Sequence, residues 1–161
     1  MTLLLIPLLP FIGFLINASV GKRLSKSVSG LVAVAAMVVS FAASLTVVLA
    51  LGRMQPDARE IVAPVFTWIS SGTFTADFTL RVDPLSALMI LVISGIGSLI
   101  HIYSTAYMHE EPDSEYARYF SYLNLFASFM LVLVLGSNFL VMFVGWEGVG
   151  LCSYQIGRAH V

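Results

Sequence analysis

One long part of the sequence carries almost no charge. Residues 119–154 form a run of 36 residues in which Glu147 is the only charged side chain. As a single helix this run would measure about 54 Å at about 1.5 Å per residue, nearly twice the hydrocarbon thickness of about 30 Å. The Gly-Ser-Asn sequence at residues 136–138 is a natural turn. The run therefore predicts two membrane-spanning helices, at residues 119–135 and 139–154.

Three further uncharged stretches have the length of a membrane span. They cover residues 2–20, 30–51 and 85–108, and the last follows Asp83 and Pro84, which suit a helix start. The chain is 58% hydrophobic and 11% charged, whereas about 25% of residues are charged in an average soluble domain. The sequence therefore predicts an all-α integral membrane helical bundle of about five transmembrane helices, the fifth of them truncated.

The segment between the second and third predicted helices has a different pattern. Apolar side chains occupy every second position: Phe74, Ala76, Phe78, Leu80 and Val82. With residues 61–69 upstream and the Ser-Ser-Gly turn between, this period of two predicts a β-hairpin at residues 61–83 on the outer membrane surface. Pro64 would require an edge position in that hairpin. The alternative is an irregular loop.

The basic residues predict an orientation. Lys22, Arg23 and Lys26 follow the first apolar stretch, whereas a signal peptide would carry positive charge before it. The positive-inside rule places this loop in the cytoplasm and the N-terminus outside, with Arg118 on the cytoplasmic side as well. The hairpin segment is then outside.

Glu147 is the exception among nine acidic residues, because the other eight lie in the predicted loops. A charge in the middle of a membrane costs about 2.5 to 3.5 kcal/mol on insertion scales, so such a residue usually has a partner or a function. Desolvation favours the protonated carboxyl, which can then load and release protons. Glu147 is therefore a candidate for a residue that loads and releases protons. The alternative is a structural carboxylate whose partner lies elsewhere, because the five spans contain no lysine or arginine.

Two histidines and three glycines invite a functional interpretation. His101, near the far end of its predicted helix with Tyr103, is a candidate proton relay, and a solvated or hydrogen-bonded interfacial histidine is the alternative. His109 lies beside two glutamates in a loop, where a solvated charge run is expected.

Glycines surround Glu147 at positions 145, 148 and 150. Because no strand precedes them, we expect them to allow close helix approach rather than to bind a nucleotide.

Composition excludes several classes of function. A net charge of −1 with eight basic residues argues against a nucleic-acid partner, which needs a concentrated basic surface. The single Cys152 cannot form an internal disulfide and is expected to be a small packing residue. No Cys or His cluster has the spacing of metal ligands, so no metal site is expected.

Four segments carry a family resemblance. They are RVDPLSAL at 81–88, HIYSTAYM at 101–108, ARYFSYLNLF at 117–126 and SNFLVMFVGWEGVGLCSY at 137–154. Over residues 1–154 the chain resembles the L subunit (chain 5 type) of bacterial respiratory NADH:quinone oxidoreductase, complex I. The GWEGVGLCSY segment favours this family over the related M and N subunits and the large subunits of multisubunit sodium/proton antiporters.

The resemblance implies a role and a set of partners. It implies a multi-pass subunit of the bacterial inner (plasma) membrane that moves protons in response to quinone reduction, with Glu147 in the proton-translocating set. Other membrane subunits of complex I, the lipid bilayer and protons are the expected partners. NADH, FMN, iron-sulfur clusters and quinone are expected in other subunits, with no cofactor and no redox chemistry in this chain. The alternatives are a subunit of a multisubunit cation/proton antiporter and a non-catalytic membrane scaffold.

The last seven residues depart from the family pattern. The family continues after its Ser and Tyr with a Leu, Leu, Ile, Gly, Phe run, whereas here Gln155 leads into IGRAHV. One reading frame of a widely used sequencing adapter translates into these last six residues. Residues 155–161 are therefore expected to be non-native, which makes the fifth helix a truncated one.

Overall fold

The computed structural model describes residues 2–158, except for the side chains of Lys22, Phe74 and Arg158. It contains five helices that are long and apolar enough to cross a membrane. These are α1 (Thr2–Val20), α2 (Lys26–Gly52), α3 (Pro84–Tyr107), α4 (Asp113–Leu135) and α5 (Phe139–Arg158). Between α2 and α3 lie β1 (Ile61–Ser71) and β2 (Phe74–Val82), and two short 3-10 turns are η1 (Gly21–Arg23) and η2 (Pro56–Ala58). The predicted membrane bundle with a hairpin is confirmed.

The helices differ from the apolar stretches mainly at their ends. Helix α2 begins at Lys26 rather than residue 30, and α4 begins at Asp113 rather than residue 119. Hydropathy predicts only the part of a helix that fits within the hydrocarbon, whereas a helix can continue into water with polar side chains. Asp113 and Glu115 also occupy the first turn of α4, where negative charge is favourable. Helix α5 continues beyond residue 154 to Arg158.

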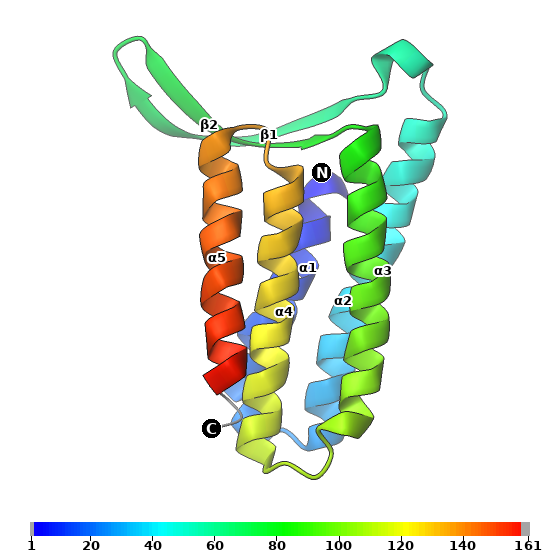
Figure 1. Cartoon of the computed structure of the whole chain (residues 1–161), viewed down its shortest axis with the longest axis vertical. Coiled ribbons are helices and arrows are strands. Elements are labelled where there is room, and N and C mark those ends of the chain that lie inside the picture. The colour runs from blue at the N-terminus through cyan, green and yellow to red at the C-terminus, as the bar shows by residue number, and fades with distance from the viewer. Residues whose placement is uncertain (1, 159–161) are drawn as a thin grey trace.

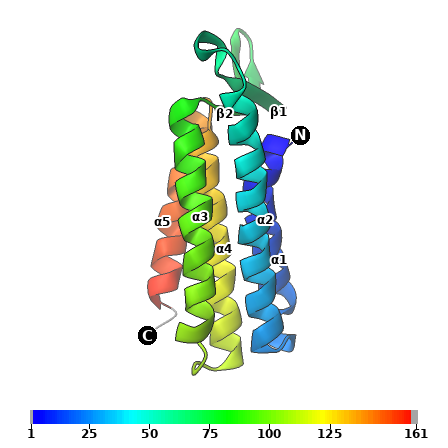
Figure 2. The same cartoon turned by 90° about the vertical axis from the view of Figure 1, so that its right-hand side faces the viewer.

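The five helices run along one common axis, and α4 is the central one (Figures 1 and 2). Helix α4 packs against α1, α2, α3 and α5, whereas α5 packs chiefly against α4. The hairpin lies across one end of the bundle, beside the N-terminus, and we call this the hairpin end (Figure 1). The loop that carries Lys22, Arg23 and Lys26 lies at the opposite end, which we call the basic end. Helix α5 is therefore peripheral within the described bundle.

The hairpin also fixes the turn between α4 and α5. Strands β1 and β2 pair in antiparallel fashion, with a register shift just after Pro64. Gly72 in the hairpin turn has a φ of 58°, a conformation that glycine adopts without strain. At its other edge β2 pairs with the start of the α4–α5 turn, where the Ser137 amide donates to the Thr79 carbonyl at 3.1 Å and Leu80 bridges to Gly136. The hairpin thereby sets where α5 begins.

Two apolar clusters fill the bundle, and polar side chains separate them. The cluster at the hairpin end includes Ile90 on α3 and Leu131 on α4, and the one at the basic end includes Met108 and Phe120. Along α3 and α4, the buried polar residues between these clusters are Ser94, Ser98, His101, Ser104, Ser121, Asn124 and Ser128. Buried polar side chains of this kind hold transmembrane helices together or mark a functional site.

Candidate functional site

Helix α5, one of the helices long and apolar enough to cross a membrane, carries Glu147 away from the hairpin end. Asn138 caps the helix, because its Oδ1 accepts a hydrogen bond of 3.0 Å from the Val141 amide while its Nδ2 donates to the Asp77 carbonyl at 2.8 Å. Glu147 lies eight residues after Phe139, the first residue of α5. At about 1.5 Å per residue, that places the carboxylate region about 12 Å from the start of the helix.

Two of the three glycines around Glu147 bring α5 close to α4. A Cβ at Gly145 would lie 2.6 Å from the backbone of Leu133, and a Cβ at Gly148 would overlap the ring of Phe129. These positions are three residues apart, so they share one helix face. The expectation of close helix approach is confirmed for both. Within residues 2–158 it is wrong for Gly150, because a Cβ at this position would have no atom within 4 Å. Two residues turn a helix by about 200°, so Gly150 lies on the other side of α5 from Gly148.

The Glu147 side chain is exposed on the face of α5 that points away from α4. Phe143 and Trp146 on neighbouring positions of α5 are also more than half exposed. Within residues 2–158, the structure gives Glu147 no hydrogen bond and no ion pair. The face that carries Glu147 is therefore left open by α1–α4.

His101 is buried rather than solvated. Its exposed fraction is 1%, and its ring packs against Phe120 with a centroid separation of 6.3 Å. Nδ1 lies 2.7 Å from the Gly97 carbonyl oxygen, and Nε2 lies 2.9 Å from Oδ1 of Asn124 on α4. The expected neighbour Tyr103 is exposed on another face and stacks on Tyr107. Of the surroundings considered for His101, the hydrogen-bonded one is correct and the solvated one is wrong.

Asn124 is the site residue that the sequence reasoning did not single out. It is fully buried at the middle of α4. A signal for it exists, because small or polar residues recur on one face of α4 at spacings of three and four, a helical stripe that faces neighbouring helices. The members of that stripe are Ala117, Ser121, Asn124, Ala127 and Ser128.

The structure does not bring His101 and Glu147 together. His101 contacts α4 through Phe120 and Asn124, whereas α5 contacts α4 through residues such as Phe129 and Leu133. Helix α4 stands between α3 and α5 (Figure 1). The two candidate residues therefore belong to separate places in the bundle.

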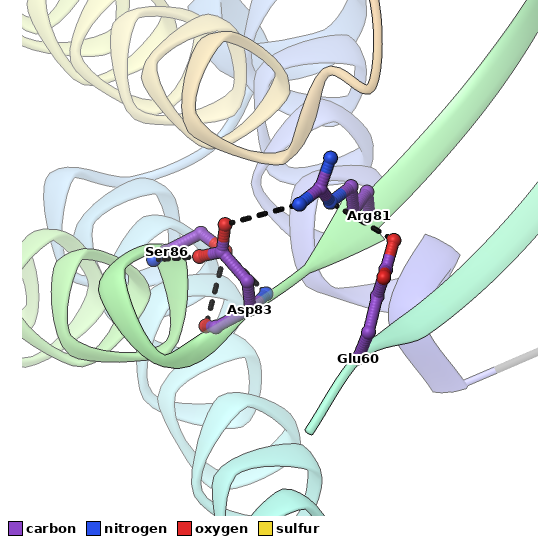
Figure 3. A network of polar contacts seen from close by, with 4 residues as sticks. All are labelled: Glu60, Arg81, Asp83 and Ser86. Carbon is purple, nitrogen blue, oxygen red and sulfur yellow. Dashed lines mark hydrogen bonds and ion pairs between the residues drawn. The ribbon is translucent and has the colours of Figure 1, made fainter. Parts of the chain in front are cut away.

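A second group of charges lies at the hairpin end (Figure 3). Asp83 caps α3, because its Oδ1 accepts from the Ser86 amide at 2.8 Å and the Ser86 hydroxyl accepts from the Asp83 amide at 2.8 Å. Arg81 connects Asp83, at 3.6 Å, with Glu60 at 3.0 Å. The hydrogen bond from the Ser86 amide is the main reason why the pKa of Asp83 is lowered, and Arg81 adds to it against the opposing effect of partial burial.

The basic end holds His109 in a charged surface loop. Nζ of Lys26 lies 3.4 Å from Oδ1 of Asp113 and donates to the His109 carbonyl at 3.1 Å. The His109 side chain is exposed, as expected for a solvated charge run. Among residues 2–158, no group of three or more His, Cys, Asp or Glu side chains could hold a metal ion.

Comparison with known proteins places this arrangement in a family. The sequence model described as "NADH-Ubiquinone oxidoreductase (complex I), chain 5 N-terminus" matches residues 68–120. NADH-quinone oxidoreductase subunit L of Escherichia coli (strain K12) is 43% identical over 149 residues, which are 92% of this chain and 24% of that protein. The chain belongs to the L and chain 5 subunit family.

Other members of the L and chain 5 family are similar over different lengths. The subunit L of Mycobacterium tuberculosis (strain ATCC 25618 / H37Rv) is 54% identical over 98 residues, which are 61% of this chain and 15% of that protein. The NADH-ubiquinone oxidoreductase chain 5 of Arabidopsis thaliana is 41% identical over 153 residues, or 95% of this chain and 22% of that protein. The chain thus spans a quarter or less of the length of these relatives.

A solved structure shares the fold. The Mrp complex from Dietzia sp. DQ12-45-1b contains a chain that is similar with a TM-score of 0.74 and 26% identity. The similarity covers 96% of this chain and 16% of that one. The fold of this chain is therefore similar to part of a chain in the Mrp complex.

Proposed function

We propose that the full-length protein is a proton-translocating membrane subunit of a bacterial NADH:quinone oxidoreductase and that Glu147 carries protons. The observation that carries the proposal is the position of Glu147, well inside the membrane on the open face of α5 and without a partner among residues 2–158. A carboxylate is costly there unless it pairs or titrates. The names of the relatives, all subunits of this oxidoreductase, support the redox coupling.

In this proposal the chain itself performs no redox chemistry. Partner subunits bind NADH, FMN, iron-sulfur clusters and quinone, and other membrane subunits of complex I pack against this one. The open face of α5 is a surface where such a neighbour, or a further helix of the full-length protein, supplies the group that exchanges a proton with Glu147. A lysine there stabilises the charged carboxylate and, once it moves away, favours the neutral acid.

The test is Glu147→Gln in the full-length protein. Glutamine has nearly the same volume but no titratable proton, so the complex should assemble while proton translocation per NADH oxidised falls. Glu147→Asp keeps the acid and should be milder. Glu110→Gln is the matched control, because it removes an exposed carboxylate in the loop between α3 and α4. The readout is proton uptake by vesicles, normalised to assembled complex.

The outcomes separate the proposal from a scaffold role. Wild-type translocation by Glu147→Gln would exclude an essential proton-carrying role for this residue. Activity that falls only in proportion to assembled complex would indicate a structural carboxylate, since removing one member of a buried network costs stability first.

The likeness to the Mrp complex supports a second candidate, a subunit of a multisubunit cation/proton antiporter. An antiporter exchanges a cation against protons with no electron donor. Sodium-driven proton movement in vesicles without NADH would favour this candidate, whereas movement that requires NADH oxidation favours the oxidoreductase.

A further inference from the structure

His101 lies between two carbonyl oxygens inside the bundle. Its Nδ1 is 2.7 Å from the Gly97 backbone oxygen, which can only accept a hydrogen bond, so Nδ1 carries a hydrogen. Its Nε2 is 2.9 Å from Oδ1 of Asn124. A neutral imidazole with its hydrogen on Nδ1 would present a lone pair at Nε2 to the lone pairs of that oxygen. The arrangement therefore fits an imidazolium, in which both nitrogens donate.

The amide of Asn124 can also form a hydrogen bond with the neutral imidazole of His101. Its Nδ2 is a buried side-chain atom that has no hydrogen-bond partner among the described residues. A half-turn about the Cβ–Cγ bond exchanges Nδ2 and Oδ1, which have nearly the same size. After this half-turn Nδ2 donates to Nε2 of a neutral His101. One side chain thus matches both protonation states without any movement of the backbone.

We propose that His101 and Asn124 form a proton-binding site inside the bundle, in which the Asn124 amide turns each time His101 gains or loses a proton. Uptake forms one N–H bond at Nε2 with a proton from a hydronium ion, which leaves a water molecule, and release is the reverse. The hydrogen on Nδ1 stays bound to that nitrogen and is donated to the Gly97 oxygen throughout. No other bond forms or breaks.

The side chains around His101 and Asn124 are uncharged, so a proton bound to His101 is the only charge in this site. The elements packed around it present Gly13 from α1, Ala36 and Met37 from α2, and Phe120 from α4. Two titratable side chains pack against Phe120: the ring of Tyr116 lies 4.8 Å from it and that of Tyr119 5.4 Å, and the Tyr119 hydroxyl lies 3.1 Å from Ser104. Among residues 2–158, no charged side chain faces the pair, so its hydrogen bonds decide where the proton stays.

Gly13 gives the amide its space. A Cβ at this position would lie 2.6 Å from Nδ2 of Asn124. The absence of a side chain on α1 therefore accommodates the end of the amide that turns away from His101.

A pocket lies between α1 and α4 near the basic end. This pocket has a volume of about 480 Å³, and its lining includes Asn17, Ser121 and Arg118. Asn17 lies one helical turn from Gly13 on α1, and Ser121 lies one turn from Asn124 on α4. Water in this pocket would come within one turn of the Asn124 amide, so the basic end is the side from which the proton arrives.

Proton binding at His101 rests on the proposed function only for where the proton goes after release. Proton binding at His101 and proton translocation by Glu147 can therefore be tested separately. The experiment uses the full-length protein in its complex, labelled with ¹⁵N-histidine, and assigns the His101 signals by their loss in His101→Gln. The ¹⁵N shifts then report the protonated fraction of His101 between about pH 5 and pH 8. Ser98→Ala is the control, because the Ser98 hydroxyl bonds to a carbonyl of its own helix.

Two substitutions of Asn124 should move the protonated fraction in opposite directions. Asn124→Asp can only accept from Nε2 as a carboxylate, so it should raise the proton affinity of His101 by about tenfold or more. Asn124→Leu has a similar shape but no acceptor, so it should lower the affinity by a comparable factor. Either variant alone decides the question if the other does not assemble. Wild-type protein and Ser98→Ala should titrate alike, between these limits.

Several results would overturn the proposal. One is a wild-type His101 that stays neutral over the whole pH range, and another is a titration that neither Asn124 variant changes. In Glu147→Gln the titration of His101 should remain as in wild type. Normal pumping by Glu147→Gln would contradict the proposed role of Glu147 and leave the His101 site standing.

Discussion

The hydroxyl of Ser40 on α2 donates a hydrogen bond of 2.7 Å to the backbone carbonyl of Ile6 on α1. In a regular helix this carbonyl would accept from the amide of residue 10, but residue 10 is a proline and has no N–H. Within lipid an unsatisfied carbonyl is costly, so the Ser40 hydroxyl of the neighbouring helix compensates for Pro10. Ser128 on α4 donates to the carbonyl of Pro7, at 2.8 Å, which adds a second link between α1 and the rest of the bundle. These bonds fix how α1 sits against α2 and α4.

Ser40→Ala should lower the free energy of unfolding by about 1 kcal/mol, because it leaves the Ile6 carbonyl without a donor. Pro10→Ala restores an N–H at position 10 and should remove most of that cost in the double variant. Ser98→Ala, whose hydroxyl bonds within its own helix, should cost less. The measurement is the unfolding midpoint in mixed detergent micelles, followed by circular dichroism. Equal costs of Ser40→Ala in the presence and absence of Pro10 would contradict the argument.

Gly148→Ala should weaken the packing of α5 on α4. Its Cβ would overlap the Phe129 ring, and overpacking of this kind typically costs about 1 to 3 kcal/mol. Gly150→Ala is the matched control on the open face, and it should be neutral or stabilising by less than about 1 kcal/mol, since alanine favours a helix. Cross-linking between cysteines placed on α4 and α5 would report the packing, and similar cross-linking in both variants would count against close approach at Gly148.

The fold was largely predictable because its signals are local. Length and apolar character predict each span from consecutive residues, and the period of two at residues 74–82 predicts the hairpin. The starts of α2 and α4 were not predictable in this way, because their first turns are polar and lie beyond the apolar stretches. An uncharged apolar stretch predicts only the part of a helix within the hydrocarbon and not the polar turns that extend into water.

The site was less predictable because it depends on contacts between distant residues. His101 and Asn124 are 23 residues apart in sequence, and nothing local to either residue reveals that they meet. The solvated surroundings considered for His101 were wrong, since that side of α3 faces α2 and α4 rather than the membrane surface. Glu147 was conspicuous for the opposite reason, because a single charge in an apolar run requires no knowledge of its neighbours.

Asp83→Ala should destabilise the protein by about 1 kcal/mol at pH 7, since it removes the cap of α3. The pKa of Asp83 is lowered in the folded state from an ordinary value of 3.8. Its contribution is therefore complete above pH 3.8 and is lost as the pH falls through the lower folded value. The difference between wild type and Asp83→Ala should narrow in acid, as measured by unfolding midpoints at several pH values. If the difference in unfolding midpoint between wild type and Asp83→Ala stayed constant as the pH fell, the prediction would be wrong. Asp77→Ala, at an exposed hairpin position, is the control.

The basic residues predict how the protein is oriented in the membrane. The basic loop at residues 22–26 should lie in the cytoplasm, because lysine and arginine resist translocation, and the hairpin lies at the other end of the bundle (Figure 1). Ser25→Cys and Ser71→Cys place a thiol at exposed positions of the two ends, while the native Cys152 is buried and can be replaced by alanine to remove its background. An impermeant maleimide added to intact cells should label Ser71→Cys, and it should label Ser25→Cys only after the membrane is opened. Labelling of Ser25→Cys alone in intact cells would show that the protein is inserted the other way round.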